Sequence, residues 1–533
     1  MAAKLPLRAN AAMAACAAGI TRTTAGTSGI HHGEMAHLRS KISLRIARGS
    51  LASRAGRVLL AVALTTTSCS TLQSVSDSVL GGGPDPAAGT PGHVRGFLGG
   101  VAADEPQAAL AARQILSAGG NAADAAVALG FALAVTLPSR AGLGGGGACL
   151  AFRAGKEGAG KEGGGAPEAI MFMATAPANA GASDRPVGLP AMTRGLFVLH
   201  ARYGSRPFES LIAPAEQMAR FGTPASRAFV RDLQVVAGPL SGDPGAREAF
   251  FPRGQPVAEG GTMLQPSLGA TLSQIRIAGV GDLYQGALGR RLAAAAGQIG
   301  ARITLDDLRA GLPSVVAPLT LPGPLSDRIA FLPPPADGGL AAAAAYQVLA
   351  TTPGAIDQAG NRALAVAARW RRGGIDAAAV LQESLGDAAL PNLPASTSYA
   401  TLDQNGNAVV CAVSMGNLFG IGRVAPNTGV LLGASPAAMP PPLLSAAIAY
   451  NPNLHAFHAA VGGSGQSGAP LAVAIGLAQT LPDRRAVAQP NPGAVPEPGR
   501  ANIIACSQYL PDADGSCSWA TDPRGSGLAI GSN

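Results

Sequence analysis

The stretch ASTSYATLDQNGNAVVCAVSMGNLFGIG, residues 395–422, carries the most structural information in the sequence. Three hydroxyl residues, Ser396-Thr397-Ser398, stand at the head of an alternating strand pattern, and the turn Asn405-Gly406-Asn407 leads into a second one. If the chain is cut just before the hydroxyls, the new α-amino group can act as the base for the adjacent hydroxyl. The pattern is therefore compatible with a strand-head nucleophile that needs no catalytic histidine. The alternative, which the triplet taken alone favours, is that all three hydroxyls are ordinary residues at the start of a strand.

The segment before the triplet, residues 386–395, reads GDAALPNLPA and is typical of a loop. Exposed loops of this kind are the segments at which chains are cut most readily. Helical patterns fill most of the chain before this loop, and strand patterns dominate after it. This order predicts a layered α/β or α+β protein whose sheets are stacked between helices.

The formal net charge of +8 is concentrated at the N-terminus. Residues 1–57 hold nine basic residues and one acidic residue, and the rest of the chain carries 30 of each sign. A body without net charge provides no attractive field for a phosphate backbone. We therefore expect no nucleic-acid partner.

The N-terminal region is typical of an export signal. A basic stretch, residues 39–57, precedes the apolar run VLLAVAL, residues 58–64, which is too short to span a bilayer as a permanent helix. Thr67-Ser68-Cys69 then resembles a lipoprotein cleavage box, although Thr66 stands where such boxes usually have an aliphatic residue. We expect an exported, periplasmic protein with Cys69 as the candidate site of lipidation and membrane anchoring. A simple cleaved signal and an ordinary hydrophobic helix are the alternatives.

Residues 1–69 thus read as a presequence, of which residues 1–34 are spurious if translation starts at Met35. Residues 70–95 are rich in Ser, Gly and Pro, a composition typical of a tether.

Four cysteines lie beyond the presequence. Cys506 and Cys517 are close together in a polar tail with turn residues between them, so we expect a disulfide in an oxidising periplasm. Cys149 and Cys411 lie in apolar, strand-like runs, and we expect them to be buried thiols.

Eleven blocks, taken in order, resemble the γ-glutamyltransferase family (γ-glutamyl transpeptidase, glutathione hydrolase) of N-terminal nucleophile hydrolases. They are VAADEP (101–106), AGGNAADAAVA (118–128), AGLGGGG (141–147), VGLPAMTRG (187–195), YGSRPFESLIAPAEQMARFG (203–222), DLYQGALGRRLA (282–293), ITLDDL (303–308), PPPADGG (333–339), STSYATLDQNGNAV (396–409), FGIG (419–422) and VGGSGQS (461–467). The resemblance covers roughly residues 94–480.

The resemblance implies a layered αββα fold of the α+β class, with two stacked, mainly antiparallel sheets between helix layers. It divides the chain into a large-subunit-like region, residues 96–395, and a small-subunit-like region, residues 396–483. A Pro-rich linker and a Cys-stapled tail, residues 484–533, follow.

The family implies autocatalytic cleavage, here between Ala395 and Ser396, which makes Ser396 the nucleophile where the family has Thr. Thr397 is the alternative if the loop is one residue shorter. Ser414 stands where the family has a Thr that hydrogen-bonds the nucleophile. The glycine-rich loop takes the place of the family's oxyanion-hole glycines and comprises Gly462, Gly463, Ser464, Gly465 and Gln466.

Several positions depart from the family's pattern for holding the α-carboxylate and α-amine of a γ-glutamyl group. The family's arginine falls on Met173, its asparagine on Gly416, its acidic pair on residues 435–438 (SPAA), and its two serines near Pro442-Leu443. Each lost charge-assisted contact costs about 1.5–3 kcal/mol. Ordinary recognition of glutathione is therefore not expected.

Two hypotheses follow. The first is an exported hydrolase or acyltransferase that acts on amide bonds of the γ-glutamyl type in a small molecule or peptide. It would consist of large and small subunits cut from one chain and use no cofactor. The second is a catalytically inactive periplasmic lipoprotein of the same family, with a binding or structural role. We expect no metal site, because His455 and His458 have no Cys or acid at ligand spacing.

Overall fold

The computed structural model describes residues 98–155, 165–178, 185–391, 393–481, 491–511 and 516–531. The presequence, the candidate lipidation site Cys69 and the tether of residues 70–95 lie outside the described residues. Within the described part of the chain, no helix is both long and apolar enough to cross a membrane.

A seven-stranded antiparallel sheet contains the strand that follows the hydroxyl triplet. Its strand order is β17-β1-β9-β10-β2-β3-β6. The strands are β1 (Gly99–Ala103), β2 (Gly146–Phe152), β3 (Glu168–Phe172), β6 (Ser314–Val316), β9 (Thr397–Asp403), β10 (Ala408–Ser414) and β17 (Leu528–Gly531).

A second, six-stranded antiparallel sheet has the order β16-β15-β14-β13-β8-β7. Its strands are β7 (Leu319–Pro322), β8 (Arg328–Phe331), β13 (Ser445–Asn451), β14 (Ala456–Ser464), β15 (Arg500–Leu510) and β16 (Cys517–Thr521). Residues of the expected C-terminal tail therefore supply β15 and β16 of this sheet and β17 of the first.

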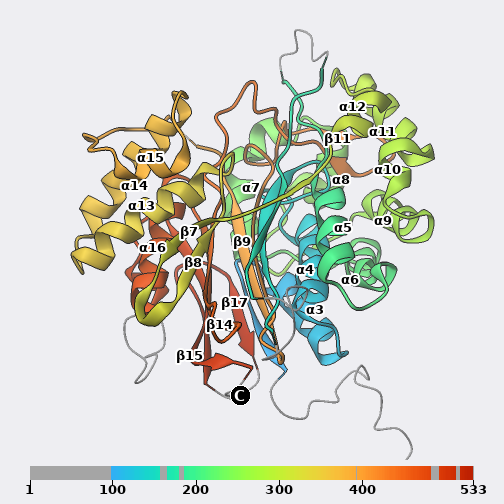
Figure 1. Cartoon of the computed structure of the whole chain (residues 1–533). Helices are drawn as coiled ribbons and strands as arrows, with labels where there is room; N and C mark the ends of the chain where they lie inside the picture. The colour runs from blue at the N-terminus through green and yellow to red at the C-terminus, as the bar shows by residue number, and fades with distance from the viewer. Residues whose placement is uncertain are drawn as a thin grey trace, which may run out of the picture. The chain divides into compact units, whose positions relative to one another are not determined.

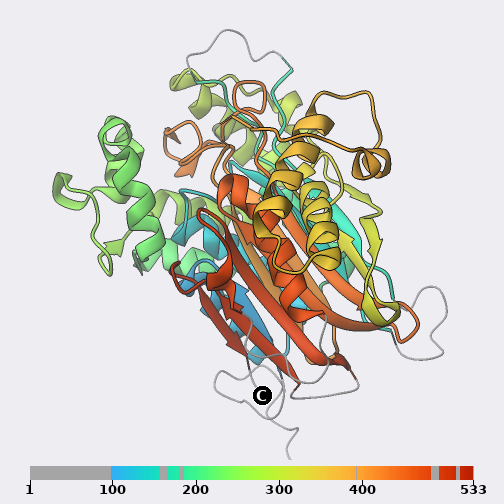
Figure 2. The same ribbon diagram turned by 90° about the vertical axis from the view of Figure 1, so that its left-hand side faces the viewer.

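The two sheets lie face to face between two helix layers (Figures 1 and 2). Helices α3 (Pro106–Ser117), α4 (Ala122–Thr136) and α5 (Met192–Tyr203) pack on the first sheet. Helices α13 (Asp337–Thr351) and α16 (Ala469–Thr480) pack on the second, and α14 (Ile356–Arg371) packs on them. One apolar core lies under each helix layer and a third lies between the sheets. The layered αββα architecture expected from the sequence is confirmed.

Helix α15 (Ala377–Gln382) packs on α13 and α14 in the layer of the second sheet. The remaining α-helices and short strands extend the layer beside the first sheet or connect the layers. They are α6 (Phe208–Phe221), α7 (Arg227–Leu240), α8 (Pro244–Phe250), α9 (Pro266–Ala278), α10 (Gly281–Gln285), α11 (Ala287–Gln298), α12 (Leu305–Ala310), β4 (Thr223–Pro224), β5 (Thr262–Met263), β11 (Val424–Ala425) and β12 (Val430–Leu431).

Helix α4 fixes the position of β9 from the helix side. All its residues are buried, as expected for an Ala-rich helix with little charge, and Asn121 and Asp124 close a capping box at its start. The carboxylate of Asp403, at the end of β9, accepts a hydrogen bond from the backbone N–H of Ala122 at 3.0 Å. The Thr401 hydroxyl donates to the carbonyl of Ala122 at 2.8 Å. Two hydrogen bonds therefore tie the far half of β9 to the first turn of α4.

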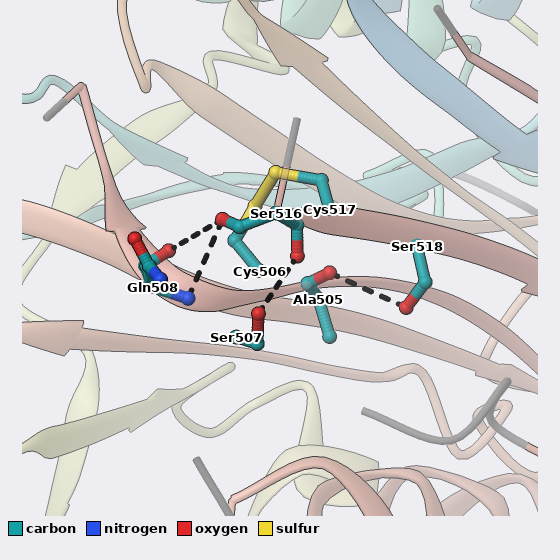
Figure 3. Close-up of a disulfide and its surroundings, with 7 residues drawn as sticks. All are labelled: Ala505, Cys506, Ser507, Gln508, Ser516, Cys517 and Ser518. Carbon is teal, nitrogen blue, oxygen red and sulfur yellow. Dashed lines mark hydrogen bonds between the residues drawn. A yellow bond between two sulfur atoms is a disulfide. The ribbon is translucent and has the colours of Figure 1, made fainter. Parts of the chain in front are cut away.

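The four cysteines in the described part of the chain form two disulfides. Cys506 and Cys517, opposite each other on β15 and β16, are bonded as the sequence predicts, with the Cα atoms 3.9 Å apart. Figure 3 shows this bond beside the hydrogen bonds from Ser507 and Ser518 across the same two strands. The expectation of buried thiols at Cys149 and Cys411 was wrong. These residues are buried, but they are directly opposite on β2 and β10 and form a disulfide.

Candidate active site

The hydroxyl triplet lies where β9 begins, and its side chains alternate between two faces of the sheet. The Thr401 hydroxyl reaches α4, and the ring of Tyr399 belongs to the core under the helix layer. Ala400 belongs to the core between the sheets, and Ser398 faces Gly462 of the second sheet. Ser396 lies one residue before β9 and is 1% exposed. By this alternation, Ser396 faces the second sheet and Thr397 faces the helix layer.

The Asp104 carboxylate holds the head of β9. Its Oδ2 atom accepts hydrogen bonds from the Thr397 hydroxyl at 2.9 Å and from the backbone N–H of Ser398 at 3.2 Å. Its Oδ1 atom accepts from Nδ2 of Asn502 at 2.9 Å. The same Nδ2 atom lies 2.9 Å from the Ser398 hydroxyl and 3.0 Å from the Ser398 carbonyl. The Thr397 hydroxyl is thus occupied by a carboxylate.

Asp104 and Asn502 were not predicted as site residues from the sequence. Asp104 lies within the block VAADEP (101–106), and its position directly after a buried strand is only a weak signal of a site. Asn502 lies in the C-terminal region that was interpreted as a tail, and nothing in the sequence places it near residue 398.

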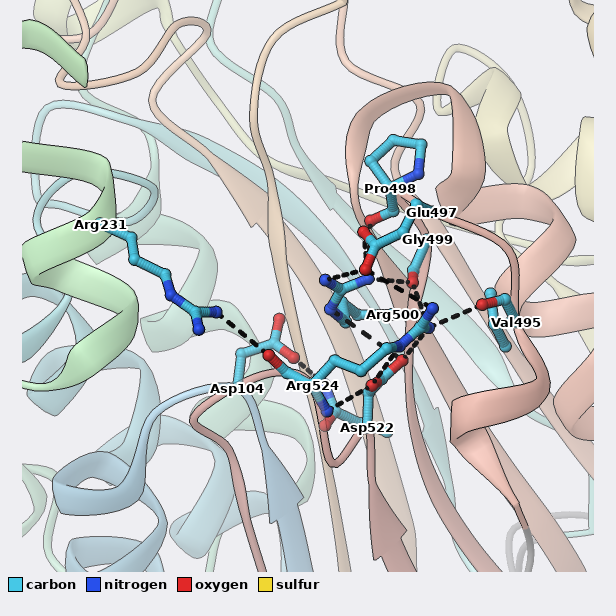
Figure 4. A network of polar contacts seen from close by, with 10 residues as sticks. Asp104, Arg231, Val495, Glu497, Pro498, Gly499, Arg500, Asp522 and Arg524 are labelled. Carbon is cyan, nitrogen blue, oxygen red and sulfur yellow. Dashed lines mark hydrogen bonds and ion pairs between the residues drawn. The ribbon is translucent and has the colours of Figure 1, made fainter. Parts of the chain in front are cut away.

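A network of arginine and acid side chains accompanies Asp104 in Figure 4. Arg231 donates to the backbone carbonyl of Arg524 at 3.1 Å, and Arg524 pairs with the buried Asp522. Arg500 donates to Glu497 at 2.9 Å. These contacts tie α7, from the helix layer, to the segment around β15 and β17.

Glu105, the neighbour of Asp104, is fully buried and caps α3 by accepting from the backbone N–H of Ala108 at 2.7 Å. Burial raises the pKa of this carboxyl group to about 7, because the charged form loses its hydration. Its Oε1 atom has no hydrogen-bond partner.

Ser414, the last residue of β10, contacts the predicted cleavage junction directly. Its hydroxyl donates to the carbonyl oxygen of Ala395 at 2.7 Å and accepts from the backbone N–H of Gly416 at 3.0 Å. A hydrogen bond to this oxygen stabilises the negative charge that develops there when the carbonyl carbon is attacked. The structure thus brings Ser414 and the Ala395–Ser396 bond together.

The glycine-rich loop also reaches the junction. Gly462, Gly463 and Ser464 are the last residues of β14. All three pair with β15, and Gly462 and Gly463 also pair with β13, so the loop outside the ladder begins at Gly465. Gly465 has φ 98°, in the left-handed region, and a Cβ atom there would lie 2.0 Å from the carbonyl of Pro498. The Gln466 side-chain amide donates to the carbonyl of Leu393 at 3.1 Å. The Ser464 hydroxyl is buried and has no hydrogen-bond partner.

A cavity of about 40 Å³ lies beside Ser414. Its lining carries no charged side chain and comprises Gly146, Gly147, Met173, Ala174, Ser414, Gly416, Ala434, Pro436, Met439, Pro440, Pro441, Pro442 and Leu444. Four positions at which the sequence lacks the family's polar or charged residues therefore meet in one place: Met173, Gly416, Pro436 and Pro442. A larger cavity of about 400 Å³ shares Ala434 and Met439 with it.

The histidines of β14 and its preceding turn lie in a separate environment. His458 is buried and contacts Asp327 at 2.6 Å through Nδ1, and the Tyr509 hydroxyl donates to the same carboxylate at 2.6 Å. Among the described residues, no group of three or more His, Cys, Asp or Glu side chains is arranged to hold a metal ion.

Comparison with known proteins shows which family this chain resembles. A family model described as gamma-glutamyltranspeptidase matches residues 108–365. Glutathione hydrolase 2 of Arabidopsis thaliana is 31% identical over 266 residues, which are 48% of this chain and 44% of that protein. The glutathione hydrolase proenzyme of Escherichia coli (strain K12) is 27% identical over 403 residues, or 64% of this chain and 66% of that protein. The chain thus spans between about two fifths and two thirds of the length of these relatives.

The fold is also found in a solved structure. The crystal structure of cephalosporin acylase from Bacillus halodurans matches with a TM-score of 0.65 and 20% identity, over 84% of this chain and 98% of that one. At this identity the likeness concerns the fold alone. The matching family model, the curated relatives and the layered fold together make the chain similar to the γ-glutamyltranspeptidase family.

Proposed function

We propose that this protein is a hydrolase or acyltransferase for amide bonds that frees its own nucleophile, Ser396, by cutting the Ala395–Ser396 bond. The observation that carries the proposal is the hydrogen bond from Ser414 to the Ala395 carbonyl at 2.7 Å, beside a buried serine at a strand head. The relatives' names support it, since one is called a glutathione hydrolase proenzyme.

The cleavage step follows from this geometry. The Ser396 hydroxyl oxygen attacks the carbonyl carbon of Ala395, and the Ser414 hydroxyl stabilises the negative charge on the carbonyl oxygen. The C–N bond breaks as the nitrogen takes the proton that the Ser396 hydroxyl has lost, which leaves an ester between Ala395 and the Ser396 oxygen. Water hydrolyses the ester and releases the Ala395 carboxylate and a Ser396 with a free α-amino group.

The freed residue then acts on substrate. The α-amino group takes the proton of the Ser396 hydroxyl, whose oxygen attacks the amide carbonyl and expels the amine. Water or a second amine resolves the resulting ester, which gives hydrolysis or transfer. Asp104 and Asn502 hold the head of β9 during both reactions.

We further propose that the acyl group of the substrate is small and uncharged. The cavity beside Ser414 has apolar and backbone walls, with Met173 and Pro442 where the family has polar or charged side chains. A γ-glutamyl group would bury a carboxylate and an ammonium there without partners, and each unpaired charge costs several kcal/mol in such a site.

We also propose that the protein is exported, with Cys69 as a candidate lipid anchor; the basis is the N-terminal sequence pattern alone. The rival function, an inactive member with a binding role, is favoured by the same loss of charges in the cavity.

The test is intact-mass analysis, in denaturant and reductant, of wild type, Ser396→Ala, Thr397→Val and Thr401→Val. Thr401→Val is the matched control, because Thr401 also donates its hydroxyl from β9 but far from the junction. We expect two fragments for wild type and both Thr variants, with Ser396 at the head of the smaller fragment, and one intact chain for Ser396→Ala. An uncut wild type, or a fragment that begins at Thr397, contradicts the assignment.

The substrate class is tested with chromogenic anilides of acetyl, butyryl and γ-glutamyl groups. We expect turnover of an uncharged anilide, lost in Ser396→Ala, and at least tenfold lower kcat/KM for the γ-glutamyl anilide. A preference for γ-glutamyl contradicts the uncharged pocket. A cut protein that turns over none of the three substrates supports the rival binding role.

A further inference from the structure

The Cys149–Cys411 disulfide crosses the proposed cleavage junction. Cys149 lies in β2, before the junction, and Cys411 lies in β10, after it, at a sequence separation of 262. Strands β10 and β2 pair in register from Ala408 opposite Phe152 to Ser414 opposite Gly146, and the two cysteines are direct partners within this ladder. Strand β10 also pairs with β9, the strand that follows Ser396.

We propose that this disulfide is a covalent tether that keeps the two products of self-cleavage in one molecule; its role as a tether rests on the proposed cleavage. In the uncut chain the bond closes a loop that contains the junction. Once the Ala395–Ser396 bond is cut, that loop opens, and the disulfide becomes the covalent link between the fragments. The second disulfide cannot do this, because Cys506 and Cys517 both lie after the junction.

The tether changes the physical character of the cut protein. Two separate chains reassociate at a rate and to an extent that depend on their concentration. Two linked chains reassociate within one molecule, at an effective concentration set by the linkage. The cut protein therefore unfolds and refolds as a single molecule while the bond is intact.

The position of the bond protects it. Both cysteines are 0% exposed, in the core between the first sheet and its helix layer. Exchange requires a thiolate to reach one of the sulfur atoms, so a reductant cannot attack the bond while the sheet is folded. Formation joins two thiols with the loss of two protons and two electrons. A disulfide-bearing oxidant accepts these electrons by thiol–disulfide exchange before the sheet closes.

The first experiment maps the bond independently of self-cleavage. Wild type is denatured with alkylating reagent but without reductant, digested with trypsin, and examined by mass spectrometry. We expect one linked peptide pair that contains Cys149 and Cys411 and separates on reduction. Alkylated Cys149 and alkylated Cys411 in the unreduced sample would overturn the proposal.

The second experiment tests the tether by denaturing gel electrophoresis with and without reductant. For wild type we expect one band without reductant and two with it. The double variant Cys149→Ala/Cys411→Ala should give two bands under both conditions, and the matched control Cys506→Ala/Cys517→Ala should behave like wild type. Two bands for wild type without reductant would contradict the tether.

The outcomes also separate this inference from the proposed function. A linked peptide in a chain that stays uncut with reductant refutes self-cleavage, and with it the tether, although the bond itself stands. A cut chain without the linked peptide refutes the tether and leaves self-cleavage standing. If the double alanine variant does not fold, the peptide map and the wild-type gel still decide the matter.

Discussion

Replacement of Asp104 by Asn should slow self-cleavage about tenfold without preventing folding. Asp104 is half-buried and accepts three hydrogen bonds, from the Thr397 hydroxyl, the Ser398 N–H and the Asn502 side chain. Asparagine keeps one acceptor oxygen and puts two N–H donors in place of the other, so at least one of the three donors loses its partner. A hydrogen bond to a charged group contributes about 1.5–3 kcal/mol, and the lower end applies at a half-buried site. About 1.4 kcal/mol corresponds to a factor of ten in rate, provided that the head of β9 must be ordered in the transition state.

The assay follows cleavage during cell-free synthesis by reducing gel electrophoresis, so that the uncut precursor is seen before it reacts. Asp403→Asn is the matched control, because Asp403 lies at the other end of β9 and accepts hydrogen bonds from the backbone N–H groups of Ala122, Asn405 and Asn407. This variant should lose at least as much stability, measured by urea denaturation, and cut at the wild-type rate. Wild-type cleavage in Asp104→Asn, or equal slowing in Asp403→Asn, would refute the positioning role of Asp104.

Three further substitutions test other parts of the structure. Gly463→Ala should yield little folded, cut protein, because the added Cβ atom would lie 2.2 Å from the carbonyl oxygen of Ala469. The control Gly238→Ala should fold and be cut normally, because a Cβ atom at this position of helix α7 would have no other atom within 4 Å. Glu105→Gln should be more stable than wild type at pH 8, by at most about 3 kcal/mol in urea denaturation, and show no such gain below pH 4. The reason is that burial raises the pKa of Glu105 from 4.5 to about 7, so the folded state holds the proton longer than the unfolded state and wild-type stability falls as pH rises through this window. Cys506→Ala/Cys517→Ala should lower the free energy of unfolding by about 3 kcal/mol, because the bond closes a short loop in the unfolded chain; no change in urea denaturation would contradict this.

The layers of the fold follow from local patterns, but the partners within each sheet do not. The run from Asn121 to Thr136 predicts the buried helix α4 and its cap. The alternation around residues 396–414 predicts the first two strands of the small-subunit-like region. Register is a property of two distant segments. Nothing near Cys149 indicates that Cys411 lies opposite it, so the two apolar runs were interpreted as thiol sites and the disulfide was missed.

The candidate site was predictable where a motif spans consecutive residues and not where distant strands meet. Ser396, Ser414 and the loop after Gly462 come from contiguous blocks, and the structure places Ser414 and Gln466 in contact with residues just before the junction. Asp104 and Asn502 come from opposite ends of the chain. Their contacts with residues 397 and 398 depend on β1 pairing with β9 and on the second sheet stacking against the first, and neither relation can be read from one sequence.

The topology explains why this fold can tolerate a cut at residue 395. In the first sheet, β9 and β10 follow the junction and lie between β1 and β2, which precede it. In the second sheet, β13 follows the junction and pairs with β8, which precedes it. Cleavage breaks one peptide bond in a connecting segment and interrupts no strand ladder, so the backbone hydrogen bonds that join the two parts remain. Because the disulfide lies within the β2–β10 ladder, the sheet that positions Ser396 is also the one that would keep the fragments joined.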